Sequence, residues 1–183
     1  MNIIITGQIG CGKTTVCKSL LLKLKDESFK CGGIISFKSP KGNIEVYSLT
    51  SQKKKTLALL DINVDNSNPD ILEGLKTSKY YFCNEGIKFG NEAILNSLKT
   101  DVIFVDEIGQ IELCGKGFIE ALNLIESGLA KSMVIVIRED LLEKYLKKIN
   151  FKKADLNFYI YNVNIKNRDE LPDIILQKIL NKN

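Results

Sequence analysis

The amino-acid sequence predicts an α/β protein built on a mostly parallel sheet. Five short apolar runs alternate with segments of helical periodicity, a pattern typical of parallel strands that are joined by helices. Three of the runs are not interrupted by a polar residue, as expected for strands that helices cover on both faces. The predicted strands are residues 2–6, 33–37, 102–105, 133–137 and 158–163.

Helices are predicted where apolar residues recur three and four positions apart. The first follows Lys13, a second starts near Phe118, and the last begins near Asp169 and accepts Pro172 in its first turn. The predicted buried faces are Val16, Leu20 and Leu24 in the first helix, Phe118, Ala121, Leu122, Ile125 and Leu129 in the second, and Leu171, Ile174, Ile175 and Ile179 in the last.

The stretch from residue 41 to residue 83 departs from this alternation. Residues 44–49 and 56–62 alternate like the two strands of a hairpin, and residues 63–78 are rich in Asn, Asp and Ser, which is typical of a loop. We therefore predict a small antiparallel hairpin appendage at 41–83, within a single domain that covers residues 1–183.

Composition restricts the class of protein. No run approaches the roughly 18 apolar residues that a membrane span needs, and the five scattered cysteines contain no C-x-x-C pair. We expect a cytoplasmic protein with reduced thiols, no membrane contact, and favour a monomer. Histidine is absent, so a catalytic base must be a carboxylate, lysine, cysteine or tyrosine. The net charge of +4 leaves RNA binding open, although dispersed lysines favour an ordinary solvated surface.

A phosphate-binding motif follows the first predicted strand. Residues 7–14 read G-Q-I-G-C-G-K-T and satisfy the P-loop pattern G-x-x-x-x-G-K-[ST] at each fixed position. The glycines let backbone N–H groups point at phosphates, and the helix N-terminus adds partial positive charge. We expect Lys13 to contact the β- and γ-phosphates, Thr14 to ligate Mg²⁺, and Thr15 to contact the α-phosphate. The predicted nucleotide-binding residues are Gly7, Gln8, Ile9, Gly10, Cys11, Gly12, Lys13, Thr14 and Thr15.

The third predicted strand ends in two carboxylates, Asp106 and Glu107. Ligands of open α/β sheets bind at the carboxyl ends of the strands, so Asp106 is placed to hold Mg²⁺ through water. Glu107, one position further, is placed to orient and deprotonate an attacking water. A strand that ends in Asp-Glu is ordinary by itself, and the P-loop that precedes it favours the functional interpretation.

Residues 106–113, D-E-I-G-Q-I-E-L, resemble the D-E-[IV]-G-x-[hydrophobic]-E-L signature of the small cancer-related nucleoside-triphosphatase family. The resemblance extends along the chain through Gly117-Phe118, Arg138-Glu139 and Asn167-Arg168-Asp169. It implies a three-layer, RecA-like P-loop NTPase fold with the five strands in the order 5-1-4-3-2, acting on ATP, GTP and related triphosphates with Mg²⁺. Residues 32–41 depart from the pattern, because lysines stand where better-known members carry arginines.

Several candidate residues allow two interpretations. In RecA-like sheets the fourth strand lies beside the first, so Arg138 could stabilise charge at the γ-phosphate or pair with a nearby carboxylate. Asn167 and Arg168 follow the last strand, near the end of the nucleotide that carries the base, and are also predicted nucleotide-binding residues; Arg168 could stack on a purine. Alternatively, Asn167 or Asp169 could cap the final helix. Glu112 could cap its own loop or act near the metal.

The sequence therefore predicts a Mg²⁺-dependent nucleoside triphosphatase. Lys13, Glu107 and Arg138 are the predicted catalytic residues, and Thr14 and Asp106 the predicted metal ligands. Two alternatives stay open. One is a small-molecule or nucleotide kinase that uses the same P-loop, and the other is a nucleotide-dependent regulatory or RNA-binding module.

Overall fold

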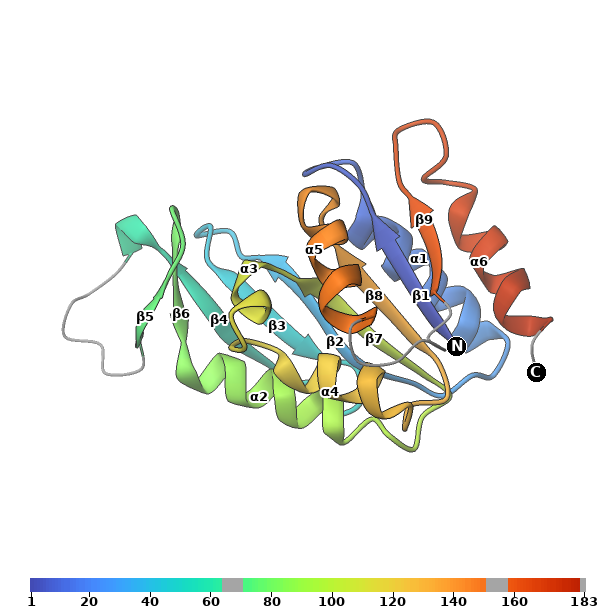
Figure 1. Ribbon diagram of the computed structural model, residues 1–183, viewed down its shortest axis with the longest axis horizontal. Helices are drawn as coiled ribbons and strands as arrows, with labels where there is room; N and C mark the ends of the chain where they lie inside the picture. The colour runs from blue at the N-terminus through green and yellow to red at the C-terminus, as the bar shows by residue number, and fades with distance from the viewer. Residues whose placement is uncertain (64–70, 151–157, 182–183) are drawn as a thin grey trace.

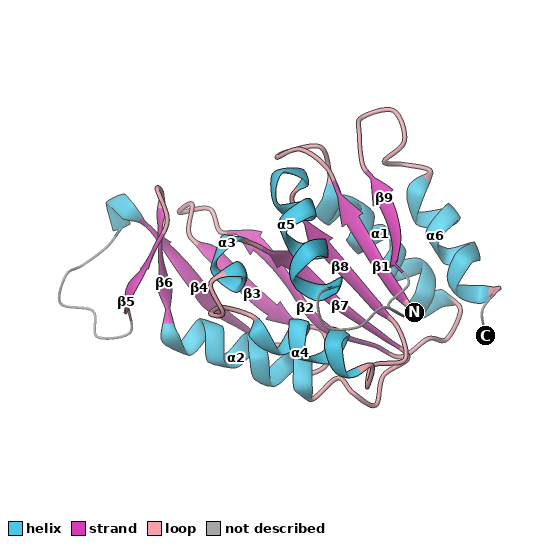
Figure 2. Ribbon diagram, in the orientation of Figure 1, coloured by secondary structure: helices cyan, strands magenta, loops and turns pink. Residues whose placement is uncertain are grey.

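Within residues 1–63, 71–150 and 158–181, which the computed structural model describes, nine strands form one sheet between helices (Figures 1 and 2). The strands are β1 (Asn2–Thr6), β2 (Cys31–Lys38), β3 (Ile44–Ser48), β4 (Lys54–Leu60), β5 (Ile71–Lys76), β6 (Tyr80–Cys83), β7 (Val102–Ile108), β8 (Met133–Ile137) and β9 (Phe158–Asn162). The helices are α1 (Lys13–Asp26), α2 (Asn84–Leu95), α3 (Gln110–Leu113), α4 (Ile119–Ser127), α5 (Glu139–Asn150) and α6 (Leu171–Leu180), with a 3₁₀ turn at Asp61–Asn63.

The sheet has a parallel half and an antiparallel half. Its strand order is β5-β6-β4-β3-β2-β7-β8-β1-β9. From β9 to β2 all pairings are parallel, and these five strands lie in the relative order predicted for them. Beyond β2 every pairing is antiparallel. The description of the sheet as mostly parallel is therefore wrong for the whole molecule.

The segment predicted as a small hairpin appendage widens the main sheet. β3 pairs directly with β2, and β4, β6 and β5 continue from it. Alternating polarity predicted the β3–β4 hairpin but could not show that β3 would cover the free edge of β2, because that pairing depends on tertiary structure. The predicted loop over residues 63–78 is also partly wrong, since β5 lies within it; residues 64–70 lie outside the described part.

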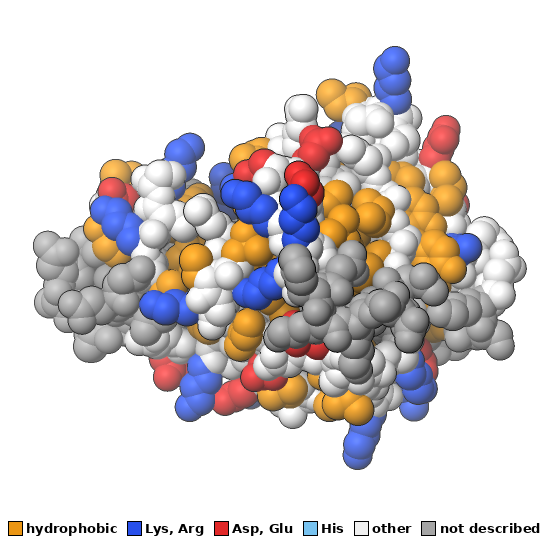
Figure 3. Space-filling model, viewed as in Figure 1, with side chains coloured by type: hydrophobic (Ala, Val, Ile, Leu, Met, Phe, Trp, Pro, Cys, Tyr) orange, Lys and Arg blue, Asp and Glu red, His pale blue; other side chains and the backbone are white. Residues whose placement is uncertain are grey.

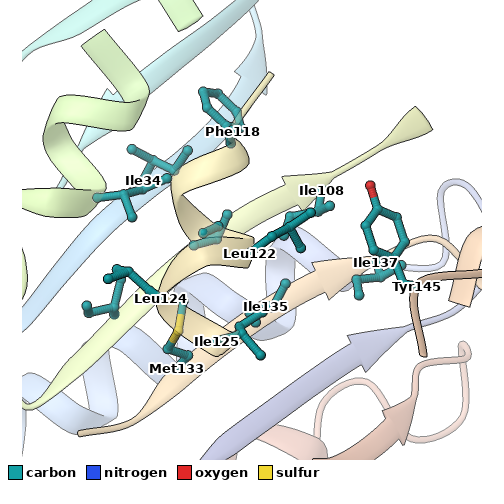
Figure 4. Close-up of a cluster of buried hydrophobic side chains, with 14 of the residues drawn as sticks. Ile34, Ile108, Phe118, Leu122, Leu124, Ile125, Met133, Ile135, Ile137 and Tyr145 are labelled. Carbon is teal, nitrogen blue, oxygen red and sulfur yellow. The ribbon is translucent and has the colours of Figure 1, made fainter. Parts of the chain in front are cut away.

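Two apolar clusters hold the layers together. One packs α2, α4 and α5 against one face of the sheet, and the other packs α1 and α6 against the opposite face. Figure 4 shows part of the first cluster, with Tyr145 of α5 at one end. The strands β1, β7 and β8 supply side chains to both clusters, as expected for strands buried on both faces.

The predicted helix faces are largely confirmed. Val16, Leu20 and Leu24 are fully buried. Two residues are exceptions: Leu129 is 68% exposed because α4 ends before it, at Gly128 with a left-handed φ of 68°. Ile174, on the outer side of α6, is 50% exposed. None of the helices in the described ranges has the length and apolar character needed to cross a membrane.

Candidate active site

The loop between β1 and α1 is built around glycines that no other residue could replace without strain. Gly7 has φ 143° and Gly12 has φ 105°. A Cβ at Gly7 would lie 2.6 Å from the carbonyl oxygen of Val163, which immediately follows β9. The backbone therefore passes close to the neighbouring strand end.

Lys13 points back into this loop. Its side chain is buried, and Nζ donates hydrogen bonds of 2.9 Å to the carbonyl oxygens of Gly7 and Gln8. The first turn of α1 contains no acidic residue of its own, and the helix N-terminus carries a positive partial charge. An ammonium group and a helix N-terminus thus serve the same loop, which is the arrangement that binds phosphate.

Asp106, near the end of β7, faces the start of α1. Its carboxylate is 2% exposed, and the Thr14 side chain hydrogen-bonds to it. Burial raises the pKa of Asp106 to about 7, the Thr14 hydrogen bond opposes that rise, and the neighbouring Glu107 charge adds to it. Among the described residues, Oδ2 of Asp106 has no hydrogen-bond partner.

These two side chains fit a Mg²⁺ site. Mg²⁺ prefers oxygen ligands, and the Thr14 hydroxyl and the Asp106 carboxylate supply two of them next to the phosphate-binding loop. A buried carboxylate oxygen without a partner is unfavourable by itself, and a cation would compensate it. Thr14 and Asp106 could therefore ligate the metal, as the sequence suggested.

Glu107 is partly buried within a set of charges. Burial raises its pKa above the ordinary value, the positive charges of Lys13 and Arg138 oppose that rise, and Asp140 adds to it. Arg138, which follows β8, lies with Nη2 3.2 Å from Oδ2 of Asp140. Its Nε is buried without a hydrogen-bond partner in the described part of the chain. Arg138 therefore pairs with a nearby carboxylate, Asp140, and its charge also acts on Glu107, while its action at a γ-phosphate stays a prediction.

Hydrogen bonds between residues near the strand ends connect the parts of the site. The sequence did not predict these contacts. The Glu139 N–H approaches the carbonyl oxygen of Gly7 at 3.4 Å, and Asn162 Nδ2 donates to Glu139 Oε1 at 3.1 Å. Glu139 begins α5 shortly after β8, and Asn162 ends β9; these two strands lie on either side of β1. No sequence motif predicts this contact, because the proximity of the two residues depends on the strand order.

The predicted pair Asn167 and Arg168 occupies the loop before α6. The Asn167 side chain accepts from Asn164 N at 2.8 Å and donates to Asn162 O at 2.9 Å, so it organises this loop. The helix-capping alternative is wrong, since α6 has Glu170 at its N-cap and no side-chain cap bond. Arg168 pairs with Asp169 at 3.2 Å, and its Cδ would lie 3.2 Å from a Cβ at Gly12. The structure thus brings Arg168 against the P-loop.

The Glu112 side chain binds backbone groups of its own loop. Its carboxylate is 3% exposed and accepts hydrogen bonds from the N–H groups of Gly109 (2.8 Å) and Phe118 (2.9 Å). Burial raises its pKa to about 7, although both backbone hydrogen bonds oppose that rise. Of the two interpretations of Glu112, these contacts favour the cap.

The phosphate-binding loop, the paired carboxylates and the parallel strands between them define a P-loop nucleotide-binding protein. Residues 2–176 match the NTPase family model, and the chain belongs to that family. It is similar to the Nucleoside-triphosphatase THEP1 of Methanosarcina acetivorans, with 30% identity over 100% of this chain and 98% of the relative. The protein of the same name from Methanocaldococcus jannaschii is 30% identical, over 98% of each chain.

A solved structure agrees with this fold. The crystal structure of THEP1 from the hyperthermophile Aquifex aeolicus superposes with a TM-score of 0.73 and 22% identity, covering 98% of this chain and 99% of that one. The likeness shows an α/β fold with a mixed sheet. The family resemblance of residues 106–113 is thereby confirmed, together with the enzyme class that it implied, a nucleoside triphosphatase.

The raised pKa of Asp106 predicts a pH-dependent stability. The folded protein binds this proton more tightly than the unfolded chain, whose Asp106 pKa is near 3.8, so the free energy of unfolding should fall as pH rises from about 4 to 7. A shift of this size corresponds to at most about 4 kcal/mol. Asp106→Asn carries no charge and should flatten this slope, measured by urea unfolding in EDTA at several pH values.

Asp101→Asn is the control for this measurement. The pKa of Asp101 is lowered by hydrogen bonds from the Lys131 side chain and the Lys30 N–H, so its charged form stabilises the fold above about pH 4. Asp101→Asn should therefore lower the free energy of unfolding at neutral pH. The effect of Asp106→Asn there should have the opposite sign. Equal pH slopes in the parent and Asp106→Asn would contradict the burial argument.

Proposed function

We propose that this enzyme hydrolyses the γ-phosphate of ATP, GTP and related nucleoside triphosphates with Mg²⁺, releasing the diphosphate and inorganic phosphate. The observation that carries the proposal is the convergence of Lys13, Asp106 and Glu107 beside the P-loop. The NTPase family match and the nucleoside-triphosphatase relatives support the same activity.

The phosphates bind to the backbone of residues 7–13 and to the N-terminus of α1. Lys13 exchanges its two carbonyl partners for oxygens of the β- and γ-phosphates, since a charged donor prefers an anionic acceptor. Thr14 and Asp106 hold Mg²⁺, which supplies charge neutralisation at the phosphate oxygens when it is bound. Arg168, which lies over Gly12, is placed to cover the nucleoside end of the ligand.

Glu107 is the general base. A water oxygen forms a bond to the γ-phosphorus, the bond from that phosphorus to the bridging oxygen breaks, and the water proton passes to Glu107. A base works best when its pKa approaches the operating pH, and burial raises that of Glu107 in this direction. Arg138 stabilises the charge that develops on the phosphoryl oxygens, and its buried Nε is free to donate.

Neither alternative function is favoured by a particular observation. A kinase would need an acceptor site, and incubation with Mg·ATP alone separates the two reactions, because a kinase should release little phosphate without an acceptor. For RNA binding a collected basic surface would be expected. On the face shown in Figure 3, lysine and arginine side chains are dispersed among acidic and apolar ones.

Lys13→Ala should abolish phosphate release and weaken triphosphate binding, because the ammonium group neutralises the phosphates both in the bound nucleotide and in the transition state. Titration of a fluorescent nucleotide analogue and a phosphate-release assay measure the two effects. Lys25→Ala, at the far end of α1, is the control and should behave as the parent. Parental turnover in Lys13→Ala would remove the P-loop from the reaction.

Glu107→Gln should lower kcat by about 10²- to 10⁴-fold, the usual contribution of a positioned base. Affinity for Mg·ATP should stay within a few-fold, because Glu107 is assigned to the water and not to the phosphates. Asp106→Asn should differ by raising the Mg²⁺ concentration needed for half-maximal activity. If Glu107→Gln turned over at the parental rate, another group would have to activate the water.

A further inference from the structure

The turn that follows β7 depends on side chains outside it. α3 contains only one turn, Gln110–Leu113, which is too short to be stable by its own hydrogen bonds. The Glu112 carboxylate ties the N–H of Gly109, before the turn, to the N–H of Phe118, after it. This buried carboxylate therefore closes residues 109–118 into a compact unit.

Helix α5 holds the same unit through its carbonyl groups. The Tyr145 hydroxyl donates to the carbonyl oxygen of Gly109. Lys148 Nζ donates to the carbonyl oxygens of Glu112 at 3.0 Å and Leu113 at 2.9 Å. Lys148 thus adds a donor to the last carbonyls of the α3 turn, where the Glu112 carbonyl also accepts from the Gly115 N–H at 3.1 Å, and Tyr145 binds the carbonyl that precedes the turn. The Tyr145 ring is fully buried in the core cluster, which fixes the position of its hydroxyl (Figure 4).

The N-terminal end of α5 lies near Arg138 and Glu107. α5 begins at Glu139, directly after Arg138, and Asp140 in its first turn pairs with Arg138. The charges of Arg138 and Asp140 both act on Glu107. One helix therefore contacts the site twice, at Arg138 and Asp140 through its N-terminus and at the turn after Glu107 through Tyr145 and Lys148.

We propose that Tyr145 and Lys148 are positioning residues for Glu107. Gly109, which Tyr145 holds, is two residues from Glu107, so a shift of the α3 turn moves the Glu107 carboxylate away from the attacking water. Both side chains hydrogen-bond to the backbone of the turn. The inference rests on the role of Glu107 under the proposed function, and it adds that α5 sets the distance between Glu107 and Arg138.

Lys148→Met with the control Lys147→Met tests this inference. Both lysines lie on α5, but Lys147 is exposed and pairs with Glu143 instead of the turn. Lys148→Met should lower kcat by about 10- to 100-fold, the cost of a small misplacement of a catalytic group, with KM for Mg·ATP within about twofold of the parent. Lys147→Met should match the parent. Equal kcat values for the two variants would overturn the inference.

A double-mutant cycle separates positioning from general damage to the fold. In a Glu107→Gln background, Lys148→Met should cost less than about twofold, because the group that it positions is already disabled. Independent, multiplicative losses would overturn the inference. Parental turnover of Glu107→Gln alone would instead refute the role of Glu107 as the base under the proposed function, so the two failures are distinguishable.

Two further variants, Lys148→Arg and Tyr145→Phe, test the same positioning role. Lys148→Arg retains a charged donor and should recover most of the lost kcat. Tyr145→Phe removes only the hydroxyl and keeps the buried ring, so it carries the same test if Lys148→Met does not fold. Tyr145→Phe should lower kcat with KM retained, and a parental kcat in this variant would count against the inference.

Discussion

The parallel pairing of β8 with β1 on one side and β7 on the other is the constraint on which the site depends. It places the carboxyl ends of all three strands at one edge of the sheet. The P-loop leaves β1 there, Asp106 and Glu107 lie near the end of β7, and Arg138 follows β8. A change in the order of these strands would separate the phosphate-binding groups from the carboxylates, whatever the local sequence.

The same edge concentrates charged groups that burial disfavours. Lys13, Asp106 and Glu112 are buried, and the pKa values of both carboxyl groups are raised for that reason. The three are satisfied in different ways. Lys13 uses backbone carbonyls and Glu112 uses backbone N–H groups, whereas one Asp106 oxygen has no partner among the residues that the structure describes. The unpartnered Asp106 oxygen therefore lowers the stability of the ligand-free protein, and a bound ligand could offset this loss. Such a loss of stability is common at functional sites.

Features that depend on residues close together in the chain could be predicted from local motifs. The P-loop pattern, the strand that ends in Asp106 and Glu107, and the buried face of α1 could be read from the sequence, because each depends on residues within one or two turns of chain. The pairing of β3 with β2 could not, and neither could the hold of Lys148 on Leu113, 35 residues away. The end of α4 was also predicted wrongly. Leu129 was expected on the buried face of this helix, but it is exposed because α4 ends at a glycine just before it.

The pairing of β1 has a consequence for the order in which the chain can assemble. Asn2 aligns with Met133 in β8 and with Phe158 in β9, so the first strand waits for partners from the last third of the chain. The antiparallel half, in contrast, pairs strands that are close in sequence, and such local contacts form sooner. During synthesis from the N-terminus, the P-loop would therefore emerge well before β8 and β9, and it would reach its folded geometry only after they pair with β1. A nascent chain gains its nucleotide site only after β8 and β9 have been synthesised.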